Sequence, residues 1–341
     1  MPSINAIKVT EEFLSVLPKR ARDVLERRFG LGKFHERKTL EAIGSSYGIT
    51  RERVRQIEAY GLKKLRSHSL MKERGNVFHE LKEELSRRGG IAEENKFLTE
   101  LASNPDEKNH INFLLTLHDD FKRIKEDDEF HHRWISDSKS ADACHETLKV
   151  LHKDLESQEP LAESDIKLKL ASTAKNTVSE GGLTDQAISS WLAVSKMVKP
   201  NKLGEWGLVS SPHISPRGVR DLAFLVMKRH GSPMHFSGVA GAIRKNLGEK
   251  AHVQTVHNEL IKDTRFVLVG RGLYALKEWG YEPGTVREII KNILVSSGPM
   301  AKDKLIEKVL KERHVKLSTI KINLQDKRHF KTLEDGQISV A

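Results

Sequence analysis

Hydrophobic and polar positions in the segment Thr39–Arg66 alternate with the period of an α-helix, and the pattern is interrupted once. Leu40 and Ile43 lie three apart on one face of a first short helix, and Gly48 breaks the pattern. Thr50 is a favourable N-cap for a second helix, in which apolar positions again recur on one side. These positions are Val54, Ile57, Gly61 and Leu65. The sequence therefore predicts two amphipathic helices joined by a tight turn, a helix-turn-helix.

The opposite side of the second helix is rich in groups that can hydrogen-bond to nucleic acid. An Arg side chain can bind guanine through two hydrogen bonds, Gln can pair with adenine, and Glu can accept from cytosine. Arg and Lys beside them would hold phosphates and fix the register. The residues on this side and its flanks are Arg51, Glu52, Arg53, Arg55, Gln56, Ala59, Lys63 and Arg66. The pattern predicts a recognition helix that reads base edges in a major groove.

The rest of the chain is predicted to hold shorter helical and extended segments. One helical segment is expected before the helix-turn-helix, at Glu11–Arg28, and a Gly-containing basic loop, RFGLGKFHERK, follows it. After Arg66, two short helical stretches precede the segment Ile111–Trp134. That segment predicts a helix, a strand, a turn and a second strand.

This last pattern recurs along the chain, which indicates repeated modules. A copy lies 145 residues later, another lies 64 residues after that, and a weaker copy lies 68 residues before the first of these two. The shift of 145 pairs Ile111 with Val256, Leu115 with Leu260, Phe121 with Phe266 and Trp134 with Trp279. Helix, strand, Gly-centred turn and strand after two shorter helices is the outline of a winged helix. We expect four such modules, with a less regular array of three as the alternative.

The predicted fold class is mainly α with small β wings, a helix-turn-helix domain followed by a series of winged-helix modules. The expected domains are a helix-turn-helix at 1–70, a winged-helix-like module at 71–140, a helical linker plus degenerate module at 141–212, a winged helix-turn-helix at 216–280 and a last winged-helix-like module at 283–341. Linkers are expected near Glu156–Ser164, Ser210–Gly218 and Gly280–Thr285, because each holds Pro or Gly among polar residues.

The net charge of +11 is unevenly distributed. Residues 1–70 hold 15 Lys/Arg and 8 Asp/Glu, residues 71–215 hold 20 and 26, and residues 216–341 hold 23 and 13. Two basic ends around an acidic middle suggest nucleic-acid contact at both ends. The acidic run Glu126–Glu129, in the first predicted wing, would repel phosphate.

Composition bears mainly on location. The single cysteine, Cys144, excludes an intramolecular disulfide and fits a reducing compartment. No apolar run approaches the roughly 20 residues that span a bilayer. The first residues, Met1–Leu14, lack a basic stretch followed by an apolar core, so no signal peptide is predicted. We therefore expect a cytoplasmic, nucleoid-associated protein without membrane contact.

The residues LPKRARDVLERRFG, TLEAIG and TRERVRQIEAYGLKKLR, within Leu17–Arg66, closely resemble region 4 of the primary bacterial sigma-70 factors. The resemblance implies a domain that reads the −35 promoter element and docks on the flap of RNA polymerase. It implies base contacts for Arg51, Glu52, Arg55 and Gln56. Expected contacts to the DNA backbone are Lys38, Thr39, Thr50, Arg53, Lys63, Lys64 and Arg66.

The segment Val219–Trp279 resembles the HARE-type helix-turn-helix, a winged helix also found in the delta subunit of bacterial RNA polymerase. The stretches GSPMHFSGVAGAI, TVHNEL and RFVLVGRGLYALKEWG carry this resemblance. It implies contact with DNA or with polymerase-like partners. Arg265 and Arg271, at the ends of the predicted wing, are the expected DNA contacts of this module.

No enzyme site, cofactor or metal centre is predicted. The pattern G-x-G-x-x-A at Gly270–Ala275 suits a dinucleotide only where it opens a helix, and here a short strand is expected to follow. His131, His132, Cys144 and His145 lack the spacing of a zinc site. Trp134, Trp206 and Trp279 are interpreted as core anchors of their modules.

The leading hypothesis is a non-enzymatic, sequence-specific, sigma-like transcription factor. Only residues 1–16 precede the region-4-like segment, so the chain is not expected to open a promoter by itself. One alternative is an RNA polymerase-binding adaptor of delta-like type whose DNA affinity is only electrostatic. Another is the DNA-reading accessory of a restriction or repair system. The expected partners are double-stranded DNA and core RNA polymerase.

Overall fold

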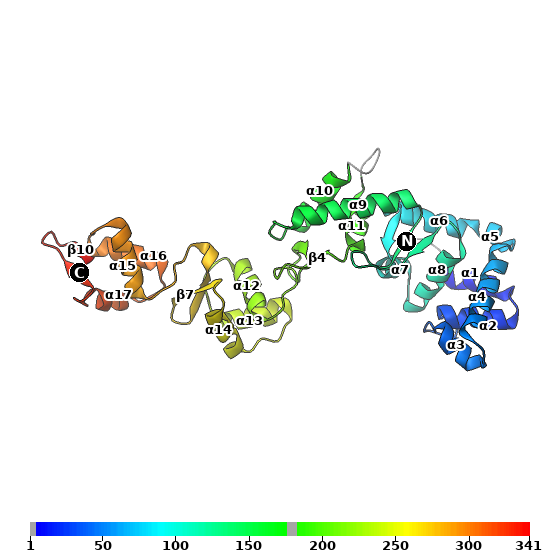
Figure 1. Ribbon diagram of the computed structural model, residues 1–341, viewed down its shortest axis with the longest axis horizontal. Coiled ribbons are helices and arrows are strands. Elements are labelled where there is room, and N and C mark those ends of the chain that lie inside the picture. The colour runs from blue at the N-terminus through cyan, green and yellow to red at the C-terminus, as the bar shows by residue number, and fades with distance from the viewer. Residues whose placement is uncertain (1–4, 176–182) are drawn as a thin grey trace. The chain divides into compact units, whose positions relative to one another are not determined.

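A computed structural model describes residues 5–175 and 183–341 of the chain. The chain divides into two compact units, Met1–Pro200 with Gly204–Val209 and Asn201–Leu203 with Ser210–Ala341, and each is described by itself. Helices dominate both units, and small antiparallel sheets accompany them (Figure 1). The predicted fold class, a helix-turn-helix followed by winged-helix-like modules, is confirmed.

The first unit begins with four helices that contain the predicted helix-turn-helix. They are α1 (Ala6–Ser15), α2 (Lys19–Phe29), α3 (Leu40–Tyr47) and α4 (Arg51–Arg66). The prediction of one helical segment at Glu11–Arg28 is wrong, because α1 and α2 are separate helices. Pro18 stands at the N-cap of α2 with ψ 144°. A proline disfavours helical geometry in the residue before it and lacks an N–H, so the chain turns there.

The first winged-helix-like module follows α4 through the short helix α5 (Leu70–Glu73). Its strands form an antiparallel sheet in the order β1-β3-β2, with the wing between β2 and β3. The elements of this first module are α6 (Gly75–Arg87), β1 (Ile91–Glu93), α7 (Glu94–Leu101), α8 (Pro105–Leu117), β2 (Lys122–Ile124) and β3 (Arg133–Ile135).

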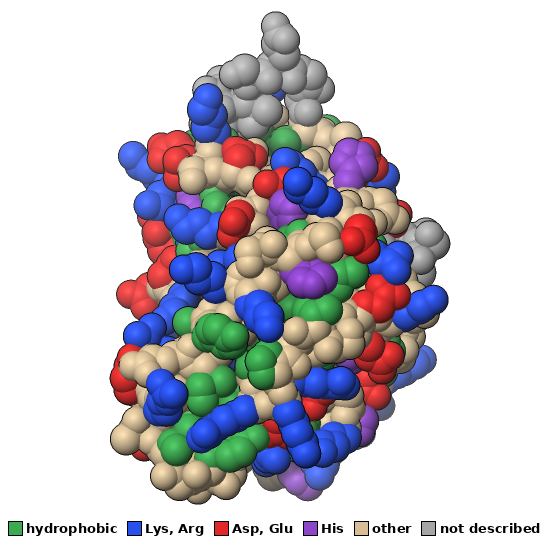
Figure 2. Space-filling model, turned by 90° about the vertical axis from the view of Figure 1, so that its right-hand side faces the viewer, with side chains coloured by type: hydrophobic (Ala, Val, Ile, Leu, Met, Phe, Trp, Pro, Cys, Tyr) green, Lys and Arg blue, Asp and Glu red, His purple; other side chains and the backbone are tan. Residues whose placement is uncertain are grey.

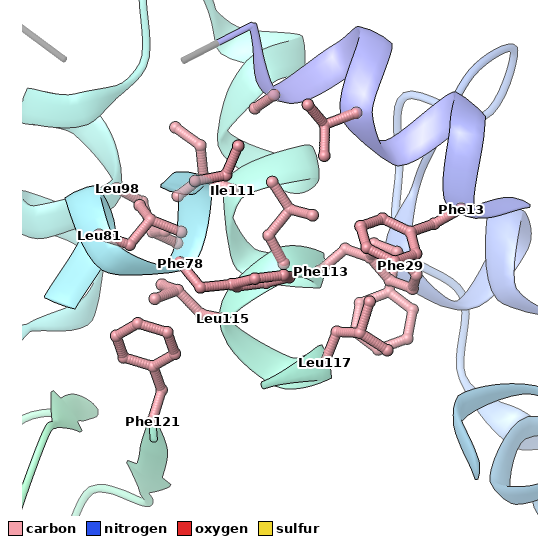
Figure 3. Close-up of a cluster of buried hydrophobic side chains, with 14 of the residues drawn as sticks. Phe13, Phe29, Phe78, Leu81, Leu98, Ile111, Phe113, Leu115, Leu117 and Phe121 are labelled. Atoms are coloured by element: carbon pink, nitrogen blue, oxygen red, sulfur yellow. The ribbon is translucent and has the colours of Figure 1, made fainter. Parts of the chain in front are cut away.

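One hydrophobic core joins the helix-turn-helix region to this first module. It contains Phe13 and Phe29 from α1 and α2, and Phe78, Phe113 and Leu117 from α6 and α8. In Figure 3, the side chains of α8 point toward both groups, and Phe113 lies between Phe78 and Phe29. The core therefore crosses residue 70, where the sequence analysis placed a domain boundary. The boundary itself stays a prediction.

The second module completes the first unit. Its elements are α9 (Ser138–Leu155), α10 (Glu163–Ala174), α11 (Asp185–Val194), β4 (Val198–Pro200) and β5 (Trp206–Leu208). The predicted linker Glu156–Ser164 connects α9 to α10, and both helices pack in one core with α11. Residues 176–182 of this predicted region, and residues 1–4 of the stretch tested for a signal peptide, lie outside the described residues.

The acidic wing of the first module contacts the second module. Glu126 lies 2.9 Å from the Nζ of Lys196, and Glu129 lies 3.5 Å from the Nζ of Lys149. The hydrogen bond from Lys196 holds the pKa of Glu126 below its ordinary value. These carboxylates are thus paired with lysines of the same chain.

The second unit holds two further modules of the same order. The third module consists of α12 (Val219–His230), β6 (Met234–His235), α13 (Phe236–Leu247), α14 (Val253–Lys262), β7 (Phe266–Gly270), β8 (Leu273–Leu276) and the 3₁₀ helix η1 (Lys277–Trp279). The fourth consists of α15 (Val286–Ser297), α16 (Lys302–Glu312), α17 (Leu317–Leu324), β9 (Phe330–Thr332) and β10 (Ile338–Val340). The sheet of the third module has the strand order β6-β8-β7, which corresponds to the order β1-β3-β2 in the first module.

An equivalent backbone pair closes each module, between the second residue before the second helix and the last wing strand. The four pairs are Ala92 with Trp134, Leu161 with Trp206, Met234 with Tyr274 and Met300 with Ile338. The predicted pairing of Trp134 with Trp279 is therefore wrong. The wing of the first module has eight residues between its strands, and the wing of the third module has two. The shift of 145 residues therefore aligns the two modules only up to this turn. Trp134 is buried, whereas Trp206 and Trp279 are partly buried against their modules.

Across residues 5–175 and 183–341, no helix has the length and apolar character that a membrane span requires.

Candidate nucleic-acid interface

The turn between α3 and α4 has the geometry that its sequence predicts. Gly48 ends α3 with φ +63°, a left-handed conformation that glycine adopts without strain. The side chain of Thr50 accepts a hydrogen bond of 3.2 Å from the N–H of Arg53 and caps α4. Thr39 caps α3 in the same way, through the N–H of Ala42. Both helices therefore begin at defined residues.

Close packing fixes the angle between the helices of this motif. Val24, Ile43 and Val54 form a small buried core, with Ile49 packed against it. A Cβ on Gly44 would lie 2.7 Å from the carbonyl oxygen of Ile49, so only glycine fits there without a shift of the turn. The two helices are thus held at one crossing geometry, which a recognition helix requires.

The predicted recognition face of α4 is exposed. Val54, Gly61 and Leu65 are buried on the opposite side, as the helical period predicts, and Ile57 is partly buried. The exposed residues of the first two turns are Arg51, Glu52, Arg53, Arg55 and Gln56. All four residues predicted to contact bases are therefore brought together at the N-terminal half of one helix.

Hydrogen bonds within α4 arrange these side chains in pairs. Arg55 donates two hydrogen bonds to the carboxylate of Glu52, at 2.8 and 2.7 Å. They lower the pKa of Glu52 and raise that of Arg55, so both groups are charged at neutral pH. Arg53 donates to the amide oxygen of Gln56 at 3.0 Å. The face thus presents polar groups whose rotamers are partly set before any ligand binds.

The residues predicted to hold the DNA backbone fall into two groups. Lys38, Thr39, Thr50 and Lys63 are exposed, and Lys64 is half-buried. Arg28 holds the protein backbone at Lys38 in place. It donates a hydrogen bond to the carbonyl oxygen of Lys38 at 3.2 Å and lies 3.4 Å from the carboxylate of Glu58 on α4. Burial raises the pKa of Glu58 above its ordinary value.

Arg66 differs from the other predicted backbone contacts. It donates to the carbonyl oxygens of Leu117 and Thr116 at 3.0 and 2.9 Å, at the end of α8. Its guanidinium is therefore engaged with protein.

The predicted wing contacts of the third module also differ from each other. Arg271 is exposed in the turn between β7 and β8. Arg265 donates to Asp221 at 2.8 Å and to Asp263 at 2.6 Å, and it lies over the ring of Phe224. The hydrogen bonds that Arg265 donates to Asp263 raise the pKa of Arg265, and its guanidinium is occupied within the module.

One prominent exposed side chain on α4 was not among the predicted contacts. Tyr60 is 54% exposed, one turn after Gln56. The helical period places Tyr60 about 40° from Gln56 around the helix axis, so the sequence could have identified it as part of the same exposed face. Lys and Arg side chains are numerous in the lower part of the face shown in Figure 2, with hydrophobic side chains between them.

The other motifs have structural explanations. Gly270–Ala275 forms the hairpin of β7 and β8, with φ +70° at Gly272, so the wing-turn interpretation is confirmed. Cys144 is buried, and His145 stacks on Phe130. Apart from residues 1–4 and 176–182, no cluster of His, Cys, Asp or Glu has a metal-binding arrangement.

Comparison with known proteins relates this region to one family. Residues 13–67 match the family described as Sigma-70, region 4, which is a DNA-binding and non-enzymatic domain. RNA polymerase sigma factor SigA of a Bacillus species is 50% identical over 62 residues, which is 18% of this chain and 16% of that protein. RNA polymerase sigma factor SigA1 of Synechococcus elongatus is 52% identical over 66 residues, with the same two coverages. The chain thus matches only a small part of these relatives. Residues 13–67 are a sigma-70 region 4 helix-turn-helix domain, as the resemblance predicted.

Proposed function

We propose that this protein is a sequence-specific DNA-binding transcription factor of sigma-like type, which acts with RNA polymerase in transcription initiation or its regulation. One observation carries the proposal. The region 4 domain presents Arg, Glu and Gln side chains together on the exposed half of a capped helix whose other side is buried. Such side chains can distinguish base pairs in a major groove.

The proposed roles follow from position on the motif. Base contacts are assigned to Arg51, Glu52, Arg55 and Gln56. Backbone contacts are assigned to Lys38, Thr39, Thr50, Arg53, Lys63 and Lys64, whose positive charges and hydroxyl groups suit phosphates. Arg271 is retained as a wing contact of the third module. Phosphate contacts would supply affinity and the α4 face would supply specificity.

We further propose that the domains predicted from the sequence act as separate parts of this function. The segment 216–280 is assigned to the HARE-type helix-turn-helix, and the basic modules of the second unit would add electrostatic contacts to DNA. Core RNA polymerase is the proposed protein partner, through its flap region. The names of the sigma-factor relatives support a polymerase partner.

An adaptor that binds polymerase without reading DNA sequence is the second candidate. The pairing of Arg55 with Glu52 favours it, because a base contact by Arg55 would have to break or reorient that ion pair. The cost is small, since an exposed ion pair is screened by water and contributes little to stability. Sequence reading therefore remains the better-supported proposal.

Random-site selection with the full chain tests the two candidates. We expect an enriched DNA motif that Arg55→Ala relaxes, while Arg22→Ala, which removes another exposed arginine, on α2, leaves it intact. If no motif is enriched and binding declines steeply with salt, DNA affinity is electrostatic and the adaptor is favoured. Binding of core polymerase to the same variants then shows whether α4 faces protein.

A further inference from the structure

Two side chains connect the helix-turn-helix to helix α8 of the first module, one at the end of α4 and one at the loop before α3. The side chain of Arg66, the last residue of α4, donates to the carbonyl oxygens of Thr116 and Leu117. The carbonyls of a last helical turn have no partner inside the helix and attract cations. Arg66 therefore joins the end of the recognition helix to the end of α8.

Asn109 makes the second connection, at the loop that enters α3. Its Nδ2 donates to the carbonyl oxygens of Gly30 and His35, both at 3.1 Å, and its Oδ1 accepts from Arg37 at 3.0 Å. The approach is close, because a Cβ on Gly30 would lie 2.9 Å from this Nδ2. Lys38 and Thr39, which are proposed backbone contacts, directly follow this loop.

Apolar packing between the two connections makes the contact continuous. The rings of Phe29 and Phe113 meet edge to face with centroids 5.2 Å apart, and Phe113 is fully buried. Leu65 of α4 and Leu117 of α8 belong to the same core. The helix-turn-helix and α8 therefore share one packed interior.

The internal repeat shows that the third helix of the third module makes no equivalent use of this position. The shift of 145 places Gln254 of α14 at the position of Asn109. Gln254 is exposed and donates to Asn258 in its own helix, at 3.3 Å. The winged-helix topology by itself does not require the Asn109 contacts.

We propose that Arg66 and Asn109 are positioning residues for DNA recognition, through which the first winged-helix-like module orients the region 4 domain. This inference rests on the proposed function. Arg66 acts through α4 and Asn109 acts through the entry loop, and neither needs to touch DNA. A helix and loop held in place before binding lose less conformational freedom in the complex. The contacts of Arg66 and Asn109 therefore form a clamp that raises the affinity for DNA.

The charge-conserving variant Arg66→Lys separates a clamp from a phosphate contact. Lys keeps the positive charge but lacks the planar fork that reaches two carbonyls. We expect Arg66→Lys and Arg66→Ala to weaken binding to the selected DNA site by a similar factor, roughly 3- to 10-fold. The slope of log K against log salt should stay at the wild-type value in Arg66→Lys. Lys63→Ala, which removes an exposed cation of the same helix, should reduce that slope by about one.

Asn109→Ala tests the entry loop, with Gln254→Ala as the matched control at the equivalent position of α14. We expect weaker DNA binding for Asn109→Ala and unchanged binding for Gln254→Ala. Amide hydrogen exchange without DNA should become faster in the loop 30–38 of Asn109→Ala and in the last turn of α4 in Arg66→Lys. Thermal unfolding must show each variant folded at the assay temperature; if Arg66→Ala does not fold, the other two variants carry the test.

The outcomes distinguish this inference from the proposed function. One contrary outcome is that Arg66→Lys binds DNA with wild-type affinity while Arg66→Ala lowers the slope of log K against log salt by about one. Arg66 would then be a phosphate contact, and the clamp would be overturned. Unchanged binding in Arg66→Lys and Asn109→Ala also overturns it, while a preferred site for the wild type keeps the function. A wild-type chain with no preferred site overturns both.

Discussion

Helices α8 and α14 are the third helices of modules with the same topology, yet their outer faces have opposite surroundings. Phe113 of α8 is fully buried against the helix-turn-helix, whereas Asn258, at the equivalent position of α14, is exposed. Asn109 is likewise bonded to another segment, and its equivalent Gln254 is bonded within its own helix. A repeated fold therefore does not fix what its third helix contacts. The side chains on the outer face decide it.

The second module extends this difference between the two units. The outer face of α11 also contacts its own unit, because Ser190 donates to the carbonyl of Ile91 at 2.9 Å and Trp191 donates to that of Gly89 at 3.3 Å. In the fourth module, Leu317 and Ile322 of α17 are 50% and 67% exposed. The first unit thus uses its third helices for internal packing, and the second unit leaves them open.

The largest expected effect comes from truncation of the buried position. Phe113→Ala removes a fully buried ring from the shared core and should lower the free energy of unfolding of the first unit by roughly 3–5 kcal/mol. Asn258→Ala, at the equivalent position of α14, should stay within about 0.5 kcal/mol of wild type. Urea unfolding of both variants tests the contrast. Equal losses would show that the two faces are equally packed.

Two helical glycines should respond to alanine with opposite sign. Gly44→Ala places a Cβ 2.7 Å from the carbonyl oxygen of Ile49 and should cost roughly 1–3 kcal/mol, because the turn must shift. Gly241→Ala in α13 meets no atom within 4 Å and should stabilise by up to about 1 kcal/mol through helix propensity. Thermal unfolding of both variants measures the signs. A stabilising Gly44→Ala would contradict the close packing of the turn.

A pH dependence is expected from His110 of α8 that the residue at the equivalent position of α14 cannot give. Burial lowers the pKa of His110 below its ordinary value of 6.5, against the weaker opposite effect of Glu11, Asp106 and Glu107. As pH falls below 6.5, the unfolded chain takes up the proton first, so stability present above that pH is lost. His110→Asn should flatten the decline of unfolding free energy between pH 7.5 and 5.

The control for this prediction is built into the repeat. Thr255 occupies the equivalent position in α14 and does not titrate, so Thr255→Ala should leave the pH dependence unchanged. Part of the slope should survive in His110→Asn, because burial also lowers the pKa of His145 in the same unit. An identical slope in wild type and His110→Asn would exclude His110 as a source.

The smallest effect is expected on the open face of α14. Ile261 is 63% exposed, so Ile261→Ser removes little buried area and should change the free energy of unfolding by at most about 0.5 kcal/mol. Urea unfolding beside Phe113→Ala provides the scale. A loss above about 1 kcal/mol would mean that this face is covered in the folded protein.

The sequence alone was sufficient for the helix-turn-helix. Its helical period, the left-handed glycine at Gly48 and the cap at Thr50 are local signals that act within one or two turns, and they recur in the structure as predicted. The predicted Gly-centred turns of the wings are local in the same way, since Gly204, Gly272 and Gly336 all have positive φ. Pro18 also carried the signal for the break between α1 and α2, although periodicity alone suggested a continuous helix.

Only the tertiary structure decided the hydrogen-bond partners of two arginines that the sequence predicted to contact DNA. In the sequence, Arg66 and Arg265 resemble the other Lys and Arg residues near them. In the structure, Arg66 binds the end of α8, and Arg265 binds Asp221 and Asp263. Residue spacing specifies the face of a helix on which a side chain lies. It does not specify which distant segment covers that face, because that depends on the packing of segments that are 44 to 51 residues apart for these two arginines. For this reason the sequence predicted the exposed polar face of α4, and the fold determined that α8 contacts the end of that helix.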